Sequence, residues 1–517
     1  MPDDSARVPI EVYVNPRKAA WPDADFVVGN PPFIGAKSMR GALGDGYVEA
    51  LRATWGDVPE SADLVMYWWH HAAQLTRRGA LKRFGLITTN SIKQTFNRRV
   101  VEEALRASRD KASPPLALIY AVPDHPWVSA ADGAAVRIAM TVGTREGRAG
   151  LVQYVRAEHQ GTDEGAEVIL EDRSGLIGAD LGVGVDPSSA GKLVANSGLS
   201  HMGVKLHGMG FVVSRPDAAA LGLGATPGLA ERVREYRNGK DLTDKPRDVL
   251  VIDLFGLEVD LVRSEFPAVF QHVLERVKPE RDQNNRESYR RNWWVFAEPR
   301  PEMRSALRTL ARYIATTETA KHRVFQFLES RIIPDQKLRV VASSDALHLG
   351  VITSAVHLTW ALKTGGTLEN RPVYNGSRCF DPFPFPTPTE AQAERIRTLA
   401  EQLDAHRKRQ QAAHPSLTLT GMYNVLEALR EGRELSAKER GIHGEGLVSV
   451  LRQIHDELDA AVLEAYGWAD LLPELRIAHG LDAAPSGDSR VEARRRFDEA
   501  VLERLVALNA ERAAEEA

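Results

Sequence analysis

The sequence Asn30-Pro31-Pro32-Phe33 combines residue types that could hold the exocyclic amine of a nucleobase. The side-chain oxygen of Asn30 and the carbonyl oxygen of Pro31 can both accept hydrogen bonds from an NH₂ group. The two prolines fix φ and remove backbone donors, so the acceptors are presented stiffly. The ring of Phe33 offers a surface on which a base turned out of its helix could stack. The simpler alternative is a strand-ending turn, for which Asn-Pro and Pro-Pro are common.

A few other side chains could contribute to such a site. Asp63 stands near the start of a predicted helix and could approach a cofactor or the base, although the helix dipole also favours a carboxylate there. Asn90 ends a predicted buried strand and could touch the base or cofactor, or could be a turn or N-cap residue. Trp68 and Trp69 could wall a base pocket, but aromatic residues at helical spacing more often belong to the core. A lone histidine in such a loop is more often structural than catalytic, and we do not predict that His125 is a catalytic base.

Residues 276–300 interleave basic and aromatic side chains, a mixture that suits phosphate contact and base stacking. The residues of this segment that we predict to contact DNA are Arg281, Arg286, Arg290, Arg291, Trp293 and Trp294. The alternative is a solvated helix face, because Glu280, Asp282 and Glu287 dilute the positive charge.

A sheet must position these residues. Apolar runs at 26–28, 84–89, 116–120 and 135–142 predict strands, and apolar side chains at helical spacing predict helices over 62–75 and 97–106. This alternation favours an α/β fold with a largely parallel, doubly wound sheet. Such sheets place ligands at the carboxyl ends of their strands, where Asn30 and Asn90 would both lie.

The chain is predicted to contain four regions. Residues 1–150 form a partial Rossmann-like catalytic region, and residues 151–199 form a connector with weak strands. Residues 200–387 form a mixed α+β domain that ends in a run of proline and aromatic residues. Residues 388–517 are helical, with predicted helices over 391–411, 447–466 and 491–516.

The composition is ordinary for a globular protein of two to four domains. The 517 residues are 43% hydrophobic and 26% charged, and the net charge of −4 means that any nucleic-acid contact must come from local patches. The single cysteine, Cys379, excludes an internal disulfide and a cysteine-based zinc site, and we predict no metal. No signal peptide or apolar run of about 20 residues stands out, so we expect a cytoplasmic protein.

Several segments resemble one known family in the order in which that family carries them. These segments are 25–35 (DFVVGNPPFIG), 61–69, 85–92, 122–139, 210–213, 236–242, 293–300 and 380–385. Together they resemble the adenine-N6 class of DNA methyltransferases, in the branch of long type II restriction-modification and DISARM-like phage-defence enzymes. The resemblance implies S-adenosylmethionine as cofactor and double-stranded DNA as partner. It also implies Asn30, Pro31, Pro32 and Phe33 as the catalytic residues, and residues 200–387 as a target-recognition domain.

The principal cofactor-binding motif of that family is not found in this sequence. It requires a glycine-rich turn after a first strand, and residues 1–21 are too short to supply it. The glycines at 181–186 and 222–225 lack the flanking strand and helix. We therefore expect a split enzyme completed by an N-terminal methyltransferase subunit or another defence-system protein, or else a truncated gene product. The alternative function is a non-catalytic DNA-recognition subunit.

Overall fold

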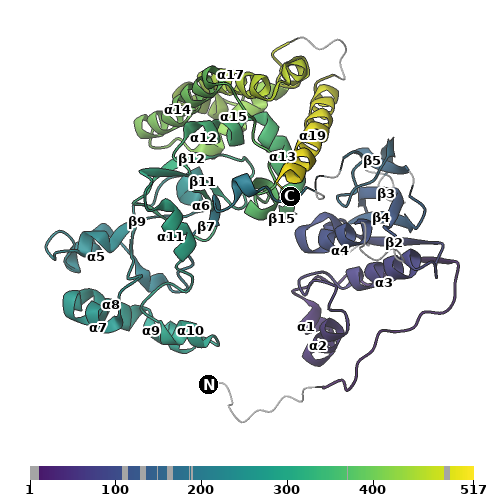
Figure 1. The fold of residues 1–517 in the computed structure, drawn as a ribbon, viewed down its shortest axis with the longest axis horizontal. Helices are drawn as coiled ribbons and strands as arrows, with labels where there is room; N and C mark the ends of the chain where they lie inside the picture. Colours follow the sequence, from purple (N-terminus) through teal and green to yellow (C-terminus); the bar gives the residue numbers. More distant parts are fainter. Residues whose placement is uncertain are drawn as a thin grey trace. The chain divides into compact units, whose positions relative to one another are not determined.

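The computed structural model describes residues 11–106, 114–127, 136–147, 149–159, 167–185, 187, 190–368, 371–482 and 489–516. The chain divides into two compact units (Figure 1). The first comprises residues 1–189 with 366–368, and the second comprises residues 190–365 with 369–517.

The first unit is built on one sheet of six strands. These strands are β1 (Phe26–Gly29), β2 (Arg83–Thr89), β3 (Ala117–Pro126), β4 (Arg137–Thr144), β5 (Gly150–His159) and β6 (Glu167–Gly175). Their order in the sheet is β1-β2-β4-β3-β5-β6. The pairs β1–β2 and β3–β5 are parallel, whereas β2–β4, β3–β4 and β5–β6 are antiparallel. The sheet is therefore mixed rather than largely parallel, because β4 returns antiparallel between β2 and β3.

Four helices accompany this sheet. They are α1 (Met39–Leu43), α2 (Asp45–Thr54), α3 (Val65–Arg77) and α4 (Thr95–Leu105), and a short 3₁₀ turn, η1 (Asn90–Lys93), follows β2. Helix α3 buries Met66, Trp69 and Ala73 in a core shared with Phe84 and Leu86 of β2. The predicted strands and helices of this region are thus present, and β5 and β6, from the segment predicted as a connector, extend the same sheet.

The second unit begins with two small sheets. The first has the order β13-β9-β10-β8 and the second has the order β12-β11-β14-β7. Their bounds are β7 (Ser200–Met202), β8 (Val212–Val213), β9 (Val233–Arg237), β10 (Leu250–Ile252), β11 (Arg312–Thr317), β12 (Gln326–Glu329), β13 (Ile333–Pro334) and β14 (Leu338–Val341). Both sheets contribute to one core, in which Val251, Tyr313 and Val340 are fully buried.

Short helices surround these sheets. They are α5 (Arg215–Ala220), α6 (Gly239–Thr243), α7 (Val259–Glu265), α8 (Pro267–Arg276), α9 (Lys278–Asp282), α10 (Glu287–Arg291) and α11 (Pro301–Leu307). Capping boxes at Ser214–Asp217 and Asn238–Asp241 satisfy backbone donors at the starts of α5 and α6. The mixed α+β character predicted for this region is confirmed.

Longer helices complete the second unit. They are α12 (Ala346–Thr353), α13 (Ala355–Gly365), α14 (Glu390–Ala413), α15 (Leu419–Glu431), α16 (Ala437–Gly446), α17 (Val448–Tyr466), α18 (Leu472–Ala478) and α19 (Ser489–Glu515). Trp360 of α13 and Phe383 are buried in one core with Leu403 of α14, Leu458 of α17 and Phe497 of α19. This shared core explains why the recognition region and the C-terminal helices form one compact unit. Among the described residues, no helix has the length and apolarity to cross a membrane.

Candidate functional site

The segment Asn30–Phe33 lies directly after β1, at the carboxyl end of the strand. Gly29 of β1 lies opposite Leu86 of β2, so β2 continues past the point where β1 ends. Pro31 is buried and Phe33 is half-buried against the core of the first unit, while Asn30 and Pro32 are exposed. Within the described part of the chain, no hydrogen bond occupies the side-chain amide of Asn30. Its oxygen and nitrogen are therefore available to a ligand.

Asp63 anchors the backbone that follows this segment. Its carboxylate accepts hydrogen bonds from the Ala36 backbone N–H (3.1 Å), from the Ser91 hydroxyl (2.7 Å) and from Asn97 Nδ2 (2.7 Å). The backbone N–H of Asp63 donates to Asn97 Oδ1 (2.8 Å). The next residue, Leu64, donates from its N–H to the Ile34 carbonyl (2.9 Å). Asp63 therefore ties three segments together, and both carboxylate oxygens are engaged by the protein.

Asn90 lies beside this arrangement, at the end of the neighbouring strand. Its Nδ2 donates to Asp124 Oδ1 (3.0 Å), and Arg137 Nε donates to the same oxygen (2.6 Å). Arg137 also reaches Glu158 (2.7 Å), and this hydrogen bond lowers the pKa of the Glu158 carboxyl. The chain of contacts fixes the nitrogen end of the Asn90 amide, so its oxygen can face a ligand.

Several residues of this edge were not singled out from the sequence. Ser91, Asn97 and Arg137 each form hydrogen bonds that hold a candidate residue in place. A lone asparagine inside a helix or a lone arginine in a strand gives no sequence signal of such a role. Lys93 also lies here, and burial lowers the pKa of its ammonium group.

Two tryptophans considered for a base pocket belong to α3. Trp69 is fully buried, and its indole Nε1 donates to Thr141 Oγ1 (3.1 Å). Its ring packs edge-on against Phe84 at 5.5 Å. Trp68 is half-buried against the same core. Trp69 is therefore a core residue rather than the wall of a base pocket. His125, the loop candidate, lies in the last part of β3 and contacts the Pro126 carbonyl through Nδ1 (2.7 Å).

Arg281, one of the predicted DNA contacts, lies inside the second unit. Its side chain is fully buried, and its Nη2 donates to the carbonyls of Leu206 (2.7 Å) and Val295 (3.0 Å). Burial lowers the pKa of the guanidinium. Because the group satisfies backbone acceptors in the interior, we correct its predicted role from DNA contact to structural support.

The two predicted tryptophans are also part of the protein's packing. Trp293 and Trp294 are half-buried against the core of the second unit. The Trp294 indole donates to the Leu257 carbonyl (2.9 Å), and the Trp293 ring meets Phe270 at 5.9 Å. Stacking between these rings and a base would require their present contacts to change.

The other three arginines that we predicted to contact DNA are exposed. Arg286 donates to the Tyr289 hydroxyl (3.0 Å), and Arg290 donates to the Asn284 carbonyl. Arg291, in the last turn of α10, has no hydrogen-bond or ion-pair partner among the residues that the structure describes. These three residues remain candidates for phosphate contact.

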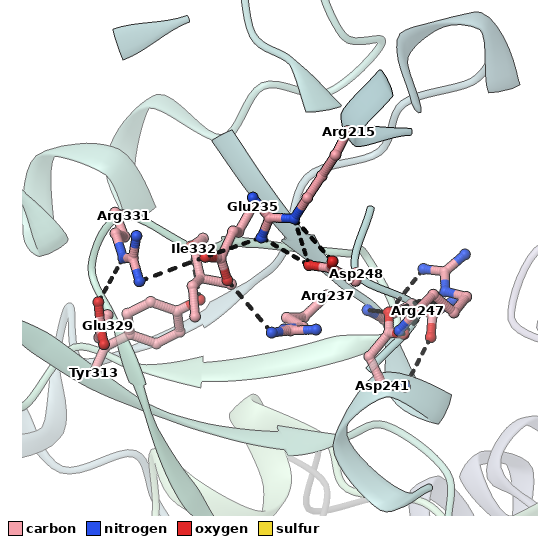
Figure 2. A network of polar contacts seen from close by, with 11 residues as sticks. Arg215, Glu235, Arg237, Asp241, Arg247, Asp248, Tyr313, Glu329, Arg331 and Ile332 are labelled. Atoms are coloured by element: carbon pink, nitrogen blue, oxygen red, sulfur yellow. Dashed lines mark hydrogen bonds and ion pairs between the residues drawn. The ribbon is translucent and has the colours of Figure 1, made fainter. Parts of the chain in front are cut away.

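A second cluster of arginines lies on the sheet that contains β9, and Figure 2 shows that carboxylates alternate with its guanidinium groups. Arg215 binds Asp248 with two nitrogens, at 2.7 and 2.8 Å. Arg331 lies between Glu329 (2.5 Å) and Glu235 (3.4 Å). Since each guanidinium already faces a carboxylate, the cluster is balanced in charge, and we assign it to holding the strands and loops together.

One group of acidic and histidine side chains has metal-like spacing. Single ligand atoms of Asp456, Asp459 and His479 all lie within 4.8 Å of one another. Arg430 Nη2, however, lies 3.1 Å from Asp456 Oδ1 and 4.0 Å from Asp459 Oδ2. Arg452 Nε lies 3.7 Å from Asp456 Oδ2 as well, so two guanidinium groups face the two carboxylates, and we describe the group as an ion-pair network between α15, α17 and the end of α18.

Family models match both functional regions of the chain. The model for "MmeI, DNA-methyltransferase domain" matches residues 2–154, and the model for "MmeI, target recognition domain" matches residues 209–387. The chain carries the DNA-methyltransferase and target-recognition domains of the MmeI family. The resemblance inferred from the sequence motifs is thereby confirmed at the level of these domains.

One solved structure of an MmeI-type enzyme shares the fold of this chain. The type IIL restriction-modification enzyme MmeI, solved in complex with DNA, aligns with a TM-score of 0.60 and 18% identity. The alignment covers 92% of this chain and 57% of that chain. A DrdV–DNA complex aligns with a TM-score of 0.35 and 11% identity, covering 87% of this chain and 57% of that one. A comparison with curated proteins finds no match.

The described residues of the MmeI-type methyltransferase domain fit one side of an S-adenosylmethionine site. On the side where a base would lie, Asn30 and Asn90 directly follow the adjacent parallel strands β1 and β2. On the cofactor side, no described strand pairs with the outer edge of β1, and Phe26 and Val28 of that strand are 59% and 86% exposed. The glycine-rich turn that would face the cofactor is not among the described residues of this sheet.

Proposed function

We propose that this chain supplies the acceptor and DNA-recognition parts of an enzyme that methylates adenine N6 in double-stranded DNA, within restriction-modification or phage defence. The observation that carries the proposal is the free amide of Asn30 at the carboxyl end of β1, beside the anchored Asn90. The MmeI-type methyltransferase and recognition domains support DNA as the substrate. Because its substrate would be chromosomal or incoming DNA, we expect such an enzyme to act in the cytoplasm.

The residues at the end of β1 would act by positioning the reacting amine. Asn30 Oδ1 and the Pro31 carbonyl would accept hydrogen bonds from the two N–H groups of the amine. The Phe33 ring would contact the face of the flipped base. S-adenosylmethionine would supply an activated methyl group. Holding the amine nitrogen in line with the methyl group would account for much of the rate enhancement, because both reactants are then bound in the reactive orientation. No side chain is needed as a strong base, since the acceptors polarise the amine before it attacks.

We infer that a cofactor-binding half completes the sheet at β1. Alternation along β1 places Phe26 and Val28 on one face and Val27 on the other, and Val27 packs against the core while Phe26 and Val28 are exposed. An open edge with bare apolar side chains is a surface that a further strand and its covering helix would bury. The cofactor-binding half could belong to the same protein or to a separate subunit.

Recognition would come from the second unit. Arg286, Arg290 and Arg291 are exposed at one end of the α9–α10 segment and would contact phosphates, which fixes the position of the protein on the duplex. They lie inside the region matched by the MmeI target-recognition domain.

The test is methyl transfer by the chain combined with its cofactor-binding half, measured with radiolabelled S-adenosylmethionine and double-stranded DNA. The proposal expects transfer that disappears in the Asn30→Ala variant. The competing function, a DNA-recognition subunit without catalysis, rests on the open edge of β1. It would be favoured if every mixture failed to methylate DNA while sequence-specific DNA binding persisted.

A further inference from the structure

We infer that Asp63 is a positioning residue that sets the geometry of the acceptor segment Asn30–Phe33 without touching the cofactor. The inference rests on the proposed methylation at Asn30 and goes beyond it, because it assigns to Asp63 a role different from the cofactor contact predicted from the sequence. It depends on where the carboxylate points and on what its oxygens already bind.

The first contact holds the acceptor segment itself. Ala36 follows Phe33 by three residues, and its backbone N–H donates to Asp63 Oδ1 at 3.1 Å. The Leu64 N–H donates to the Ile34 carbonyl at 2.9 Å. These two bonds, one in each direction, clamp residues 34–36 to the start of α3. Because prolines stiffen the preceding residues, fixing 34–36 also restricts the orientation of Asn30.

The second set of contacts reaches the neighbouring strand. Asp63 Oδ2 accepts from the Ser91 hydroxyl and from Asn97 Nδ2, both at 2.7 Å. Ser91 follows Asn90 in the turn after β2, and Asn97 lies in the first turns of α4 and is 4% exposed. One carboxylate thus joins the backbone after β1 to the turn after β2, so the spacing between Asn30 and Asn90 depends on it.

The chemistry of the contacts explains why an acid is required at this position. Three donors converge on the carboxylate, and in the described part of the chain all three are uncharged. A carboxylate only accepts and has several lone pairs, so it satisfies all three. An asparagine would offer one oxygen and would turn an N–H toward Asn97 Nδ2, itself a donor. With both oxygens engaged, the Asp63 carboxylate has little capacity left for a ligand.

Hydrogen exchange in the full chain tests the clamp without any enzymatic readout. In Asp63→Asn, we expect the Ala36 and Leu64 amides to exchange at least about tenfold faster, the effect of losing one hydrogen bond. Asp45→Asn is the matched control, since Asp45 is an exposed carboxylate that pairs with Arg40 (2.8 Å) at the start of α2. Unchanged exchange at both amides in Asp63→Asn would overturn the inference.

Steady-state kinetics of the assembled enzyme test the consequence. Asp63→Asn should lower kcat by about 10- to 100-fold while the KM values for DNA and S-adenosylmethionine change less than about twofold, because misplacement acts on the reacting geometry. A raised KM for S-adenosylmethionine with kcat retained would instead show direct cofactor contact and overturn the inference.

The two experiments separate this inference from the proposed function. If the wild-type enzyme transfers no methyl group, the proposed function fails, while the exchange measurement still decides whether Asp63 clamps the segment. If wild-type methylation is present and Asp63→Asn matches the Asp45→Asn control in kcat, the proposed function stands and the positioning role is refuted.

Discussion

The carboxyl edge of the first sheet and the recognition region of the second unit use polar side chains in opposite ways. At the sheet edge, Asp63 and Asp124 bind their neighbours, while the Asn30 amide has no partner among the described residues. In the recognition region, Arg281 and Arg215 are themselves engaged by protein acceptors. The first arrangement leaves Asn30 available to a ligand, whereas the second stabilises the fold.

The contrast shows that residue type alone does not identify a functional group. The sequence predicted DNA contact for four neighbouring arginines. Arg281 is fully buried, whereas Arg286, Arg290 and Arg291 lie at the surface a few residues away. Whether a polar side chain can bind a ligand depends on the partners that it already has within the protein. Four substitutions test whether the two regions differ in this way, and the one expected to have the strongest effect is given first.

Replacing Asn30 removes an acceptor that no described residue occupies at the sheet edge. We expect Asn30→Ala in the assembled enzyme to lower kcat by about 100- to 1000-fold, the range seen when one preorganised polar contact to the reacting group is lost. DNA affinity should stay within about twofold in a filter-binding or fluorescence assay, because base and phosphate contacts come from elsewhere. Ser38→Ala is the control, since that exposed serine makes no side-chain cap bond. Equal loss in both variants would contradict the role of Asn30.

Arg281 offers the reverse test in the recognition region. We expect Arg281→Ala to lower the free energy of unfolding by about 2–4 kcal/mol, since it leaves a cavity, removes the side-chain donor to the Val295 carbonyl and leaves the Leu206 carbonyl with only the Ala297 N–H (3.3 Å). Denaturant unfolding of the full chain measures the change. Wild-type stability combined with weakened DNA binding would restore the DNA-contact role that its burial argues against.

Val28 tests the open side of the methyltransferase sheet. Because its side chain is exposed, Val28→Lys should leave the stability of this chain unchanged, yet weaken association with a separate cofactor-binding half by at least about tenfold by burying a charge. The matched control is Ile169→Lys, on β6 at the opposite edge of the same sheet, where the residue is 52% exposed. If titration calorimetry gives equal affinities for both variants, β1 is not the docking edge.

The smallest effect is expected at Arg291. Losing one phosphate contact should weaken DNA binding by about 3- to 10-fold and reduce the slope of log K against log salt by about 1. Arg291→Ala should not change stability, in contrast to Arg281→Ala. A salt slope identical to that of the wild type would remove Arg291 from the DNA contacts.

The sequence was most informative where local pattern decides structure. The predicted helix over 62–75 corresponds to α3, and the long predicted helices near the C-terminus correspond to α14, α17 and α19. Strands of the recognition region, such as β8 and β13 with two residues each, are too short for periodicity to reveal. The antiparallel return of β4 was likewise not predicted, since alternation of elements does not specify strand direction.

For the candidate site, the motif at Asn30 could be read from adjacent residues, but its supports could not. Asp63 meets Ala36 and Asn97 across 27 and 34 residues of sequence. Such contacts exist only once the sheet has brought the loops together. The burial of Arg281 has the same origin, because the carbonyl of Leu206 that it binds lies 75 residues away.

The central claim is that the free amide of Asn30 holds an adenine amine for methylation. The most direct test is to digest DNA treated with the assembled enzyme and S-adenosylmethionine to nucleosides and identify the methylated product by mass spectrometry. The proposed chemistry predicts N6-methyl-2′-deoxyadenosine among the nucleosides, lost in Asn30→Ala. Methylation found only on cytosine, or N6-methyl-2′-deoxyadenosine formed equally well by Asn30→Ala, would contradict it.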